Sequence, residues 1–127
     1  MGTSRSVDLL RDAFERVAQA VPGLLTGLNT AQLAWYPGPF ANSIGWLVWH
    51  MARVEDDHMA GIAESEQVWL TDGWVDRFAL PYDSLDIGYG QTPDQAHRLE
   101  VGGDLLAGYY AAVHARTMEI LEGLADP

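Results

Sequence analysis

The sequence predicts an all-α protein with three principal helices, near residues 6–21, 42–64 and 92–123. In each of these segments apolar residues recur at the three- and four-residue spacing of one helix face. Capping residues, prolines and glycines mark the boundaries between the segments. At 127 residues the chain is expected to form a single domain, residues 1–127, that is long enough to bury a hydrophobic core.

The first helix is predicted to end where Pro22 and Gly23 interrupt the pattern. A shorter helical piece, residues 24–28, and a capped turn at residues 29–33 follow it. Four apolar residues form the predicted buried face of the first helix: Val7, Leu10, Phe14 and Val17.

The second helix, capped by Asn42 or Ser43, is the most informative segment, because it places histidines on or beside its predicted buried side. His58 falls near the middle of the apolar stripe, so we expect it to be buried, neutral and hydrogen-bonded to a neighbouring helix. His50 lies on the flank, one turn from Trp46 and Val54. The apolar stripe has five members: Ile44, Leu47, Met51, Val54 and Ile62.

The third helix is predicted to open at Thr92 and Pro93, with a weak point at Gly102 and Gly103. Residues 65–91 carry aromatic side chains among glycines and prolines, without a sustained period. We expect an ordered loop with at most a short pair of strands. Either this loop is functional, or its aromatic residues only cover one end of the core.

Composition limits the classes of partner. With 18 acidic and 7 basic residues the net charge is −11, which disfavours binding to nucleic acid or to an anionic membrane surface. We therefore expect a small-molecule substrate or another protein. There is no cysteine, so any metal must be held by His, Asp or Glu. No membrane span or signal peptide is recognisable, and a cytoplasmic location is expected.

The histidines give only a weak local metal signal. His50 and His58 are eight positions apart, roughly 12 Å along a helix, so they cannot share one ion. Either His50 draws further ligands from other helices, or it is a structural histidine. Asp56 and Asp57 are expected to form a solvated edge that pairs with Arg53, and of the two only Asp57 is a candidate to support His50. We expect His97 to be exposed and His114 to be half-buried.

Several segments together resemble the DinB-like superfamily, and most closely its actinobacterial branch, which is related to mycothiol-dependent maleylpyruvate isomerase and thiol transferases. The core of the likeness is the Ser-Ile-Gly-Trp-Leu-Val-Trp-His run that ends at His50. The matching segments keep the order of the family: residues 42–59, 67–69, 73–74, 77–81, 88–90 and 109–117.

The resemblance implies a bacterial up-down-down-up four-helix bundle that binds a divalent metal, zinc or nickel. His50 matches the metal-binding histidine of the second helix. The other ligands of the family lie on a fourth helix, which nothing in this sequence matches, and His114 belongs to the third-helix motif instead. We therefore expect the domain to lack the fourth helix or to be truncated before it, with a C-terminus that is incomplete.

Two functions follow from these expectations. The first is a metal-binding protein, an enzyme such as a mycothiol-dependent transferase or isomerase, whose metal presents a low-molecular-weight thiol as thiolate. The second is a non-catalytic dimerisation or binding module that has lost the metal site. Because two neighbours cannot cover the wide apolar arc of the second helix, we also expect an apolar groove lined by Trp46 and His50, and a homodimer that closes it.

Overall fold

The computed structural model describes residues 5–124, and these residues form helices and connections without a strand. Three helices are long: α1 (Arg5–Leu25), α3 (Ile44–Ala63) and α7 (Gly103–Leu124). Four are short: α2 (Thr30–Ala34), α4 (Val68–Thr71), α5 (Trp74–Phe78) and α6 (Pro93–Ala96). The all-α prediction is confirmed for this part of the chain, whereas the expected interruption at residues 125–127 lies outside it.

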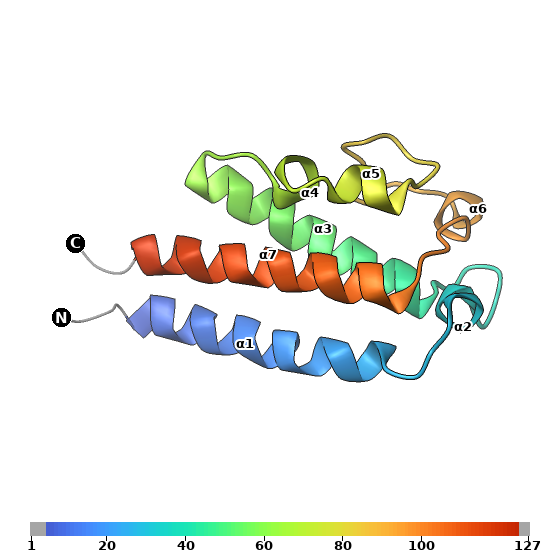
Figure 1. The fold of residues 1–127 in the computed structure, drawn as a ribbon, viewed down its shortest axis with the longest axis horizontal. Helices are drawn as coiled ribbons and strands as arrows, with labels where there is room; N and C mark the ends of the chain where they lie inside the picture. The colour runs from blue at the N-terminus through green and yellow to red at the C-terminus, as the bar shows by residue number, and fades with distance from the viewer. Residues whose placement is uncertain (1–4, 125–127) are drawn as a thin grey trace.

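The three long helices run side by side, with α7 packed against both α1 and α3 (Figure 1). The start of α1 and the ends of α3 and α7 lie at the same end of the bundle, so α3 and α7 are parallel to each other and antiparallel to α1. This is the up-down-down order expected for the first three helices. Within residues 5–124, no helix is long and apolar enough to cross a membrane.

A long crossover joins α3 to α7, because two parallel helices need a connection that returns along the bundle. It contains α4, α5 and α6 and covers one side of α3 (Figure 1). Asp56 of α3 anchors it: its carboxylate accepts the backbone N–H groups of Val68 at 3.0 Å and Trp69 at 2.9 Å. These are the first two residues of α4, so a side chain of α3 caps that short helix.

Several predicted boundaries are wrong. The first helix continues through Pro22 to Leu25. Proline has no N–H group, so the helix loses one backbone hydrogen bond at Pro22, and because Pro22 is exposed this loss falls on the solvent side. The third predicted helix is broken between α6 and α7, where Leu99 and Val101 enter the core from a non-helical segment. The capped turn at residues 29–33 is confirmed as α2, which begins with a capping box between Asn29 and Gln32.

The predicted buried stripe of the second helix is also wrong. Ile44, Leu47 and Ile62 are 38%, 50% and 57% exposed, and Met51 and Val54 are half-buried. The same holds for the first helix, in which only Val7 of the four predicted residues is buried. The reason is that α7 and the crossover lie on the other sides of α3, so the most regular apolar stripe faces outward.

Of the two acids predicted to form a solvated edge on the second helix, Asp56 is buried and Asp57 is half-buried. Asp56 is 4% exposed and Glu55 is 9% exposed, while Arg53 is fully buried. Besides capping α4, Asp56 accepts a hydrogen bond of 2.6 Å from the hydroxyl of Tyr109. It lies 3.9 Å from the Arg53 guanidinium, so the expected pairing of Arg53 with this acidic edge is present but buried. Every oxygen of this carboxylate therefore has a protein partner, which is the condition for burying a charge.

Candidate functional site

A groove of about 420 Å³ lies between α1 and α3, and Tyr89 of the crossover also lines it. Its walls are mainly apolar, and its polar groups come from two histidines and one carboxylate of α3. Nine residues line it: Phe14, Val17, His50, Met51, Val54, Glu55, His58, Met59 and Tyr89. The predicted groove beside His50 is therefore present, but Trp46 is 7% exposed and does not line it.

His50 is held in one orientation. Its Nδ1 lies 2.5 Å from the carbonyl oxygen of Ile87. Because a carbonyl oxygen can only accept, Nδ1 must be the protonated nitrogen. Trp46 stacks on the imidazole with 4.6 Å between ring centroids, and Tyr89 meets it edge-on at 5.4 Å. In the neutral ring this leaves Nε2 with a free lone pair, the state in which histidine binds a metal or accepts a proton.

The segment that fixes His50 depends on Gly88. This residue has a φ of +103°, and a Cβ atom there would lie 2.6 Å from His50 Nδ1 and 2.9 Å from Trp46. Its backbone N–H donates to Asp86 at 2.7 Å. Gln91 then joins the two ends of the turn, since it donates to Asp86 at 2.9 Å and accepts from the Trp46 indole at 2.9 Å. Only glycine fits this conformation and this contact.

Glu55 contributes a buried carboxyl group to the groove. It accepts a hydrogen bond of 2.6 Å from the Thr117 hydroxyl and one of 3.4 Å from Tyr110, both on α7. Burial raises the pKa of Glu55 above its ordinary value, and the Thr117 hydrogen bond and the nearby His114 oppose the shift. A carboxyl group with a raised pKa beside an apolar groove can give and take protons nearer to neutral pH.

His58 and Asp57 do not take the predicted positions. The side chain of His58 is 61% exposed, and its Nε2 lies 3.9 Å from Asp57. It lines the groove rather than the core, because no helix within residues 5–124 covers this stripe of α3. Asp57 accepts a hydrogen bond of 3.0 Å from Gln67 and not from His50, so the support of His50 comes from Ile87 instead.

The remaining histidines lie elsewhere. The prediction for His97 is wrong: its ring is half-buried, bonds the carbonyl oxygen of Ala41 at 2.7 Å and stacks on Tyr36. The prediction of a half-buried His114 is confirmed, and its buried Nδ1 has no hydrogen-bond partner among the described residues.

Residues 5–124 do not by themselves supply a metal site, because no group of three or more His, Asp or Glu side chains among them is placed to hold one ion. His50 offers a single nitrogen ligand. Structural and catalytic zinc sites use three or four protein ligands. The set of donors in this part of the chain therefore does not fit the metal that the resemblance implies, and the role of His50 as a ligand stays a prediction.

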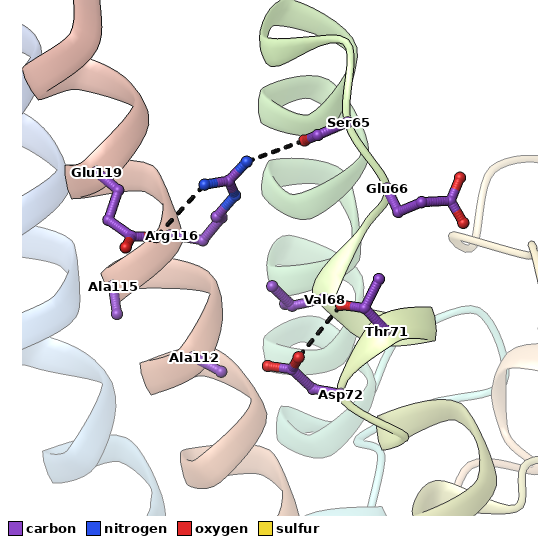
Figure 2. A pocket seen from close by; sticks show the side chains of 9 residues that line it. All are labelled: Ser65, Glu66, Val68, Thr71, Asp72, Ala112, Ala115, Arg116 and Glu119. Atoms are coloured by element: carbon purple, nitrogen blue, oxygen red, sulfur yellow. Dashed lines mark hydrogen bonds and ion pairs between the residues drawn. The ribbon is translucent and has the colours of Figure 1, made fainter.

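A second hollow, of about 530 Å³, lies between α7 and the connection from α3 to α4. Figure 2 shows Arg116 of α7 reaching across it to Ser65, at 3.2 Å, and also pairing with Glu119 at 3.4 Å. Thr71 donates to Asp72 on the opposite side. Arg116 and Glu119 pair with each other and no histidine lines this hollow, so the groove beside His50 is the stronger candidate site.

Comparison with known proteins agrees with this fold. A family model described as the DinB superfamily matches residues 13–127. The chain belongs to the DinB superfamily. A crystal structure of a conserved protein from Enterococcus faecalis is similar, with a TM-score of 0.87 and 27% sequence identity, over 95% of this chain and 72% of that chain. No match is found among curated proteins.

Sequence reasoning missed the residues that orient His50. The carbonyl of Ile87 carries no side-chain signal, and Gly88-Tyr89-Gly90 is too short to suggest a role by itself. The two glycines do indicate positive φ, which both adopt, so a turn could have been predicted there but not its contact with α3. Glu55 was missed because it follows Val54 in an acidic run that is typical of an exposed helix face.

Proposed function

We propose that this DinB-superfamily protein binds a small molecule in the groove between α1 and α3, with His50 as the polar group that the ligand or a metal contacts. The observation that carries the proposal is the fixed tautomer of His50: Nδ1 donates to Ile87, so Nε2 is left available at a mainly apolar groove. Small-molecule sites combine these two features, an apolar wall and a few polar groups held in place.

The finer proposal is a metal-dependent, mycothiol-dependent transferase or isomerase. His50 would hold zinc or nickel as one ligand, and further ligands would have to come from outside residues 5–124. When bound, the metal would supply Lewis-acid chemistry by lowering the pKa of a thiol. The contribution of this part of the chain is to orient the imidazole and to exclude water with the apolar side chains around it.

Elemental analysis of the purified protein and of His50→Ala tests this proposal. We expect stoichiometric zinc or nickel in the parent protein and its loss in His50→Ala, with unchanged helix content by circular dichroism. His58→Ala is the matched control, because it removes a groove histidine that has no orienting bond to a backbone carbonyl. Metal that persists in His50→Ala, or a parent protein without metal, would exclude the metal-dependent function.

The alternative is a non-catalytic module that self-associates or binds a partner through the same side of the bundle. The exposure of three apolar side chains supports this alternative. Leu47 and Ile62 of α3 are 50% and 57% exposed, and Leu10 of α1 is 47% exposed. Apolar side chains gathered in this way mark interaction surfaces. A protein without metal that forms a homodimer by sedimentation would support this alternative.

A further inference from the structure

The groove beside His50 presents one fixed hydrogen-bond acceptor to a ligand. Nδ1 of His50 donates to the carbonyl oxygen of Ile87, so Nε2 of the neutral ring can only accept. Nε2 has no hydrogen-bond partner among the described residues, and the stacked Trp46 ring helps to hold the imidazole plane. A ligand other than a metal ion that uses this atom must therefore bring an N–H or O–H group.

The other polar groups of the groove are already engaged or lie at its edge. Glu55 is 9% exposed, and its two oxygens accept hydrogen bonds from Thr117 and Tyr110, so its carboxyl group is directed at the interface with α7. The side chain of His58 is 61% exposed and lies 3.9 Å from Asp57. His50 is thus the group that selects a ligand by hydrogen bonding.

The groove favours an uncharged ligand. No lysine or arginine of the described chain lines it, so nothing in its wall balances the charge of an anion. The net charge of −11 repels anions further. A cation would need the carboxyl group of Glu55, whose oxygens already bond side chains of α7.

The apolar wall contains an open aromatic ring and two thioethers. Tyr89 lines the groove and is 69% exposed, so its ring is largely uncovered although it meets His50 edge-on. Met51 and Met59 line the same groove, and a thioether sulfur contacts an aromatic ring favourably. An aromatic ligand gains ring and sulfur contacts here that an aliphatic ligand of equal size does not.

Resting on the small-molecule function proposed above, we propose that the groove binds an uncharged aromatic molecule whose O–H or N–H group donates to Nε2 of His50. A phenol is the simplest member of this class. Its hydroxyl bonds the imidazole, and its ring contacts Tyr89 and the thioether of Met51. The groove volume of about 420 Å³ is within the range of small-molecule sites and holds a substituted benzene ring.

Three probes of similar size test the ligand class. They are 4-ethylphenol, 4-ethylanisole, which lacks the O–H donor, and 4-ethylcyclohexanol, which keeps the donor but lacks the aromatic ring. Calorimetry on the full chain in EDTA, at a pH where the phenol keeps its proton, should show saturable binding of 4-ethylphenol. Each of the other two compounds should bind about three- to tenfold more weakly, since each lacks one of the two contacts.

The outcomes separate this ligand class from the wider function. Equal affinity for the three probes would overturn the ligand class and leave a small-molecule groove in place. No saturable binding of 4-ethylphenol would also overturn it. Metal dependence is decided by elemental analysis of the protein before EDTA is added, so it can fail while binding of the phenol persists.

Magnetic resonance locates the ligand without a substitution. The ring current of bound 4-ethylphenol should shift the methyl signals of Met51 and Met59 but not that of Met118, which does not line the groove. The ¹⁵N resonance of His50 Nε2 should shift with 4-ethylphenol and stay in place with 4-ethylanisole. A shift at Met118 alone, or none at His50, would overturn the proposal.

One pair of variants tests the acceptor. His50→Phe removes it and keeps a ring beside Trp46, whereas His58→Phe removes the other histidine of the groove. The preference for 4-ethylphenol over 4-ethylanisole should vanish in His50→Phe and persist in His58→Phe. A preference that survives His50→Phe would overturn the role of Nε2.

A second pair tests the aromatic wall at Tyr89, whose exposure means that the core does not depend on it. Tyr89→Phe keeps the ring and Tyr89→Leu removes it. The preference for 4-ethylphenol over 4-ethylcyclohexanol should persist in Tyr89→Phe and fall by about two- to fivefold in Tyr89→Leu. Equal preferences in the two variants would contradict the contact between the ligand and this ring.

Discussion

His50 and Gly88 form the contact on which the candidate site depends at the scale of single residues. The positive φ of Gly88 lets the backbone approach the imidazole, and the preceding carbonyl of Ile87 then fixes the His50 tautomer. A Cβ atom at position 88 would collide with His50 and Trp46, at 2.6 and 2.9 Å, and would be in tight contact with Trp49 at 3.2 Å. The orientation of the histidine is therefore determined by a residue that has no side chain.

Gly88→Ala should lower the free energy of unfolding by more than Gly90→Ala does. Both glycines have positive φ, +103° and +77°, so an alanine at either position is strained by about 1–3 kcal/mol. Only Gly88 adds a collision, since a Cβ at Gly90 meets nothing within 4 Å. Urea denaturation followed by circular dichroism measures the difference. If the two variants are equally stable, the close packing of Gly88 on His50 is wrong.

The elements are joined by carboxylates of α3 that point in different directions. Asp56 caps α4 and bonds Tyr109 of α7, while Glu55 bonds Thr117 and Tyr110 of α7. Neighbouring acids on one helix thus connect it to the crossover and to the central helix. This explains why a helix can bury consecutive acidic residues that would usually be exposed.

Asp56→Ala should destabilise the protein by about 3–5 kcal/mol, because it leaves a buried arginine without its carboxylate and α4 without its cap. Asp57→Ala is the matched control. Asp57 is half-buried, accepts a hydrogen bond from the Gln67 side chain and lies 3.9 Å from the exposed His58, so its loss should cost about 1 kcal/mol. Denaturation midpoints of the two variants distinguish the roles, and similar losses would mean that Asp56 does not anchor the crossover.

Glu55 should make stability depend on pH in a defined direction. Its pKa in the folded state lies above the ordinary value of 4.5, so the folded state holds this proton more tightly than the unfolded chain does. The resulting stabilisation is complete below pH 4.5 and is lost as pH rises through the folded pKa.

Glu55→Gln removes this titration while keeping an acceptor for Thr117 and Tyr110. The free energy of unfolding of Glu55→Gln, relative to the parent protein, should therefore increase as pH rises above 4.5. Urea denaturation between pH 4 and 8 measures it, with Glu122→Gln as a control that should show no such trend. A relative stability that falls over this range would contradict the raised pKa.

At the scale of the whole molecule, the three long helices of residues 5–124 leave one side of the bundle uncovered by any other part of this described range. Apolar residues of α1 and α3 meet there, around the groove that contains His50. A fold in which α7 packs on both other long helices cannot also use α7 to cover the gap between α1 and α3. The open side is thus a consequence of the packing order.

We expect the 127-residue chain to form a homodimer through this side at micromolar concentration. Combined Leu47→Glu and Ile62→Glu substitutions should convert it to a monomer with unchanged helix content. Leu47 is 50% exposed and Ile62 is 57% exposed on this face of α3, so the core does not depend on them. Leu85→Glu is the control, since Leu85 is 61% exposed but lies in the crossover.

Sedimentation velocity measures the outcome. Each copy carries a net charge of −11, so added salt should strengthen the association by screening the repulsion between copies. A parent protein that sediments as a monomer at all concentrations would show that the open side is stable in contact with water, and it would contradict the predicted homodimer.

The sequence by itself determined the all-α class, the bounds of α1 and α3 to within a few residues, the end of α7 but not its start, and the capped turn at residues 29–33. It also directed attention to His50 and to a groove beside it. These features depend on the spacing and the chemistry of residues that are close in the sequence, and the hydrophobic periodicity of a sequence reflects both. Only the tertiary structure decided which side of each helix is buried, because that depends on where the neighbours lie. The regular stripe through Leu47 and His58 faces outward. Arg53 and Asp56 are buried, since they pair with each other and bond Tyr109 of α7.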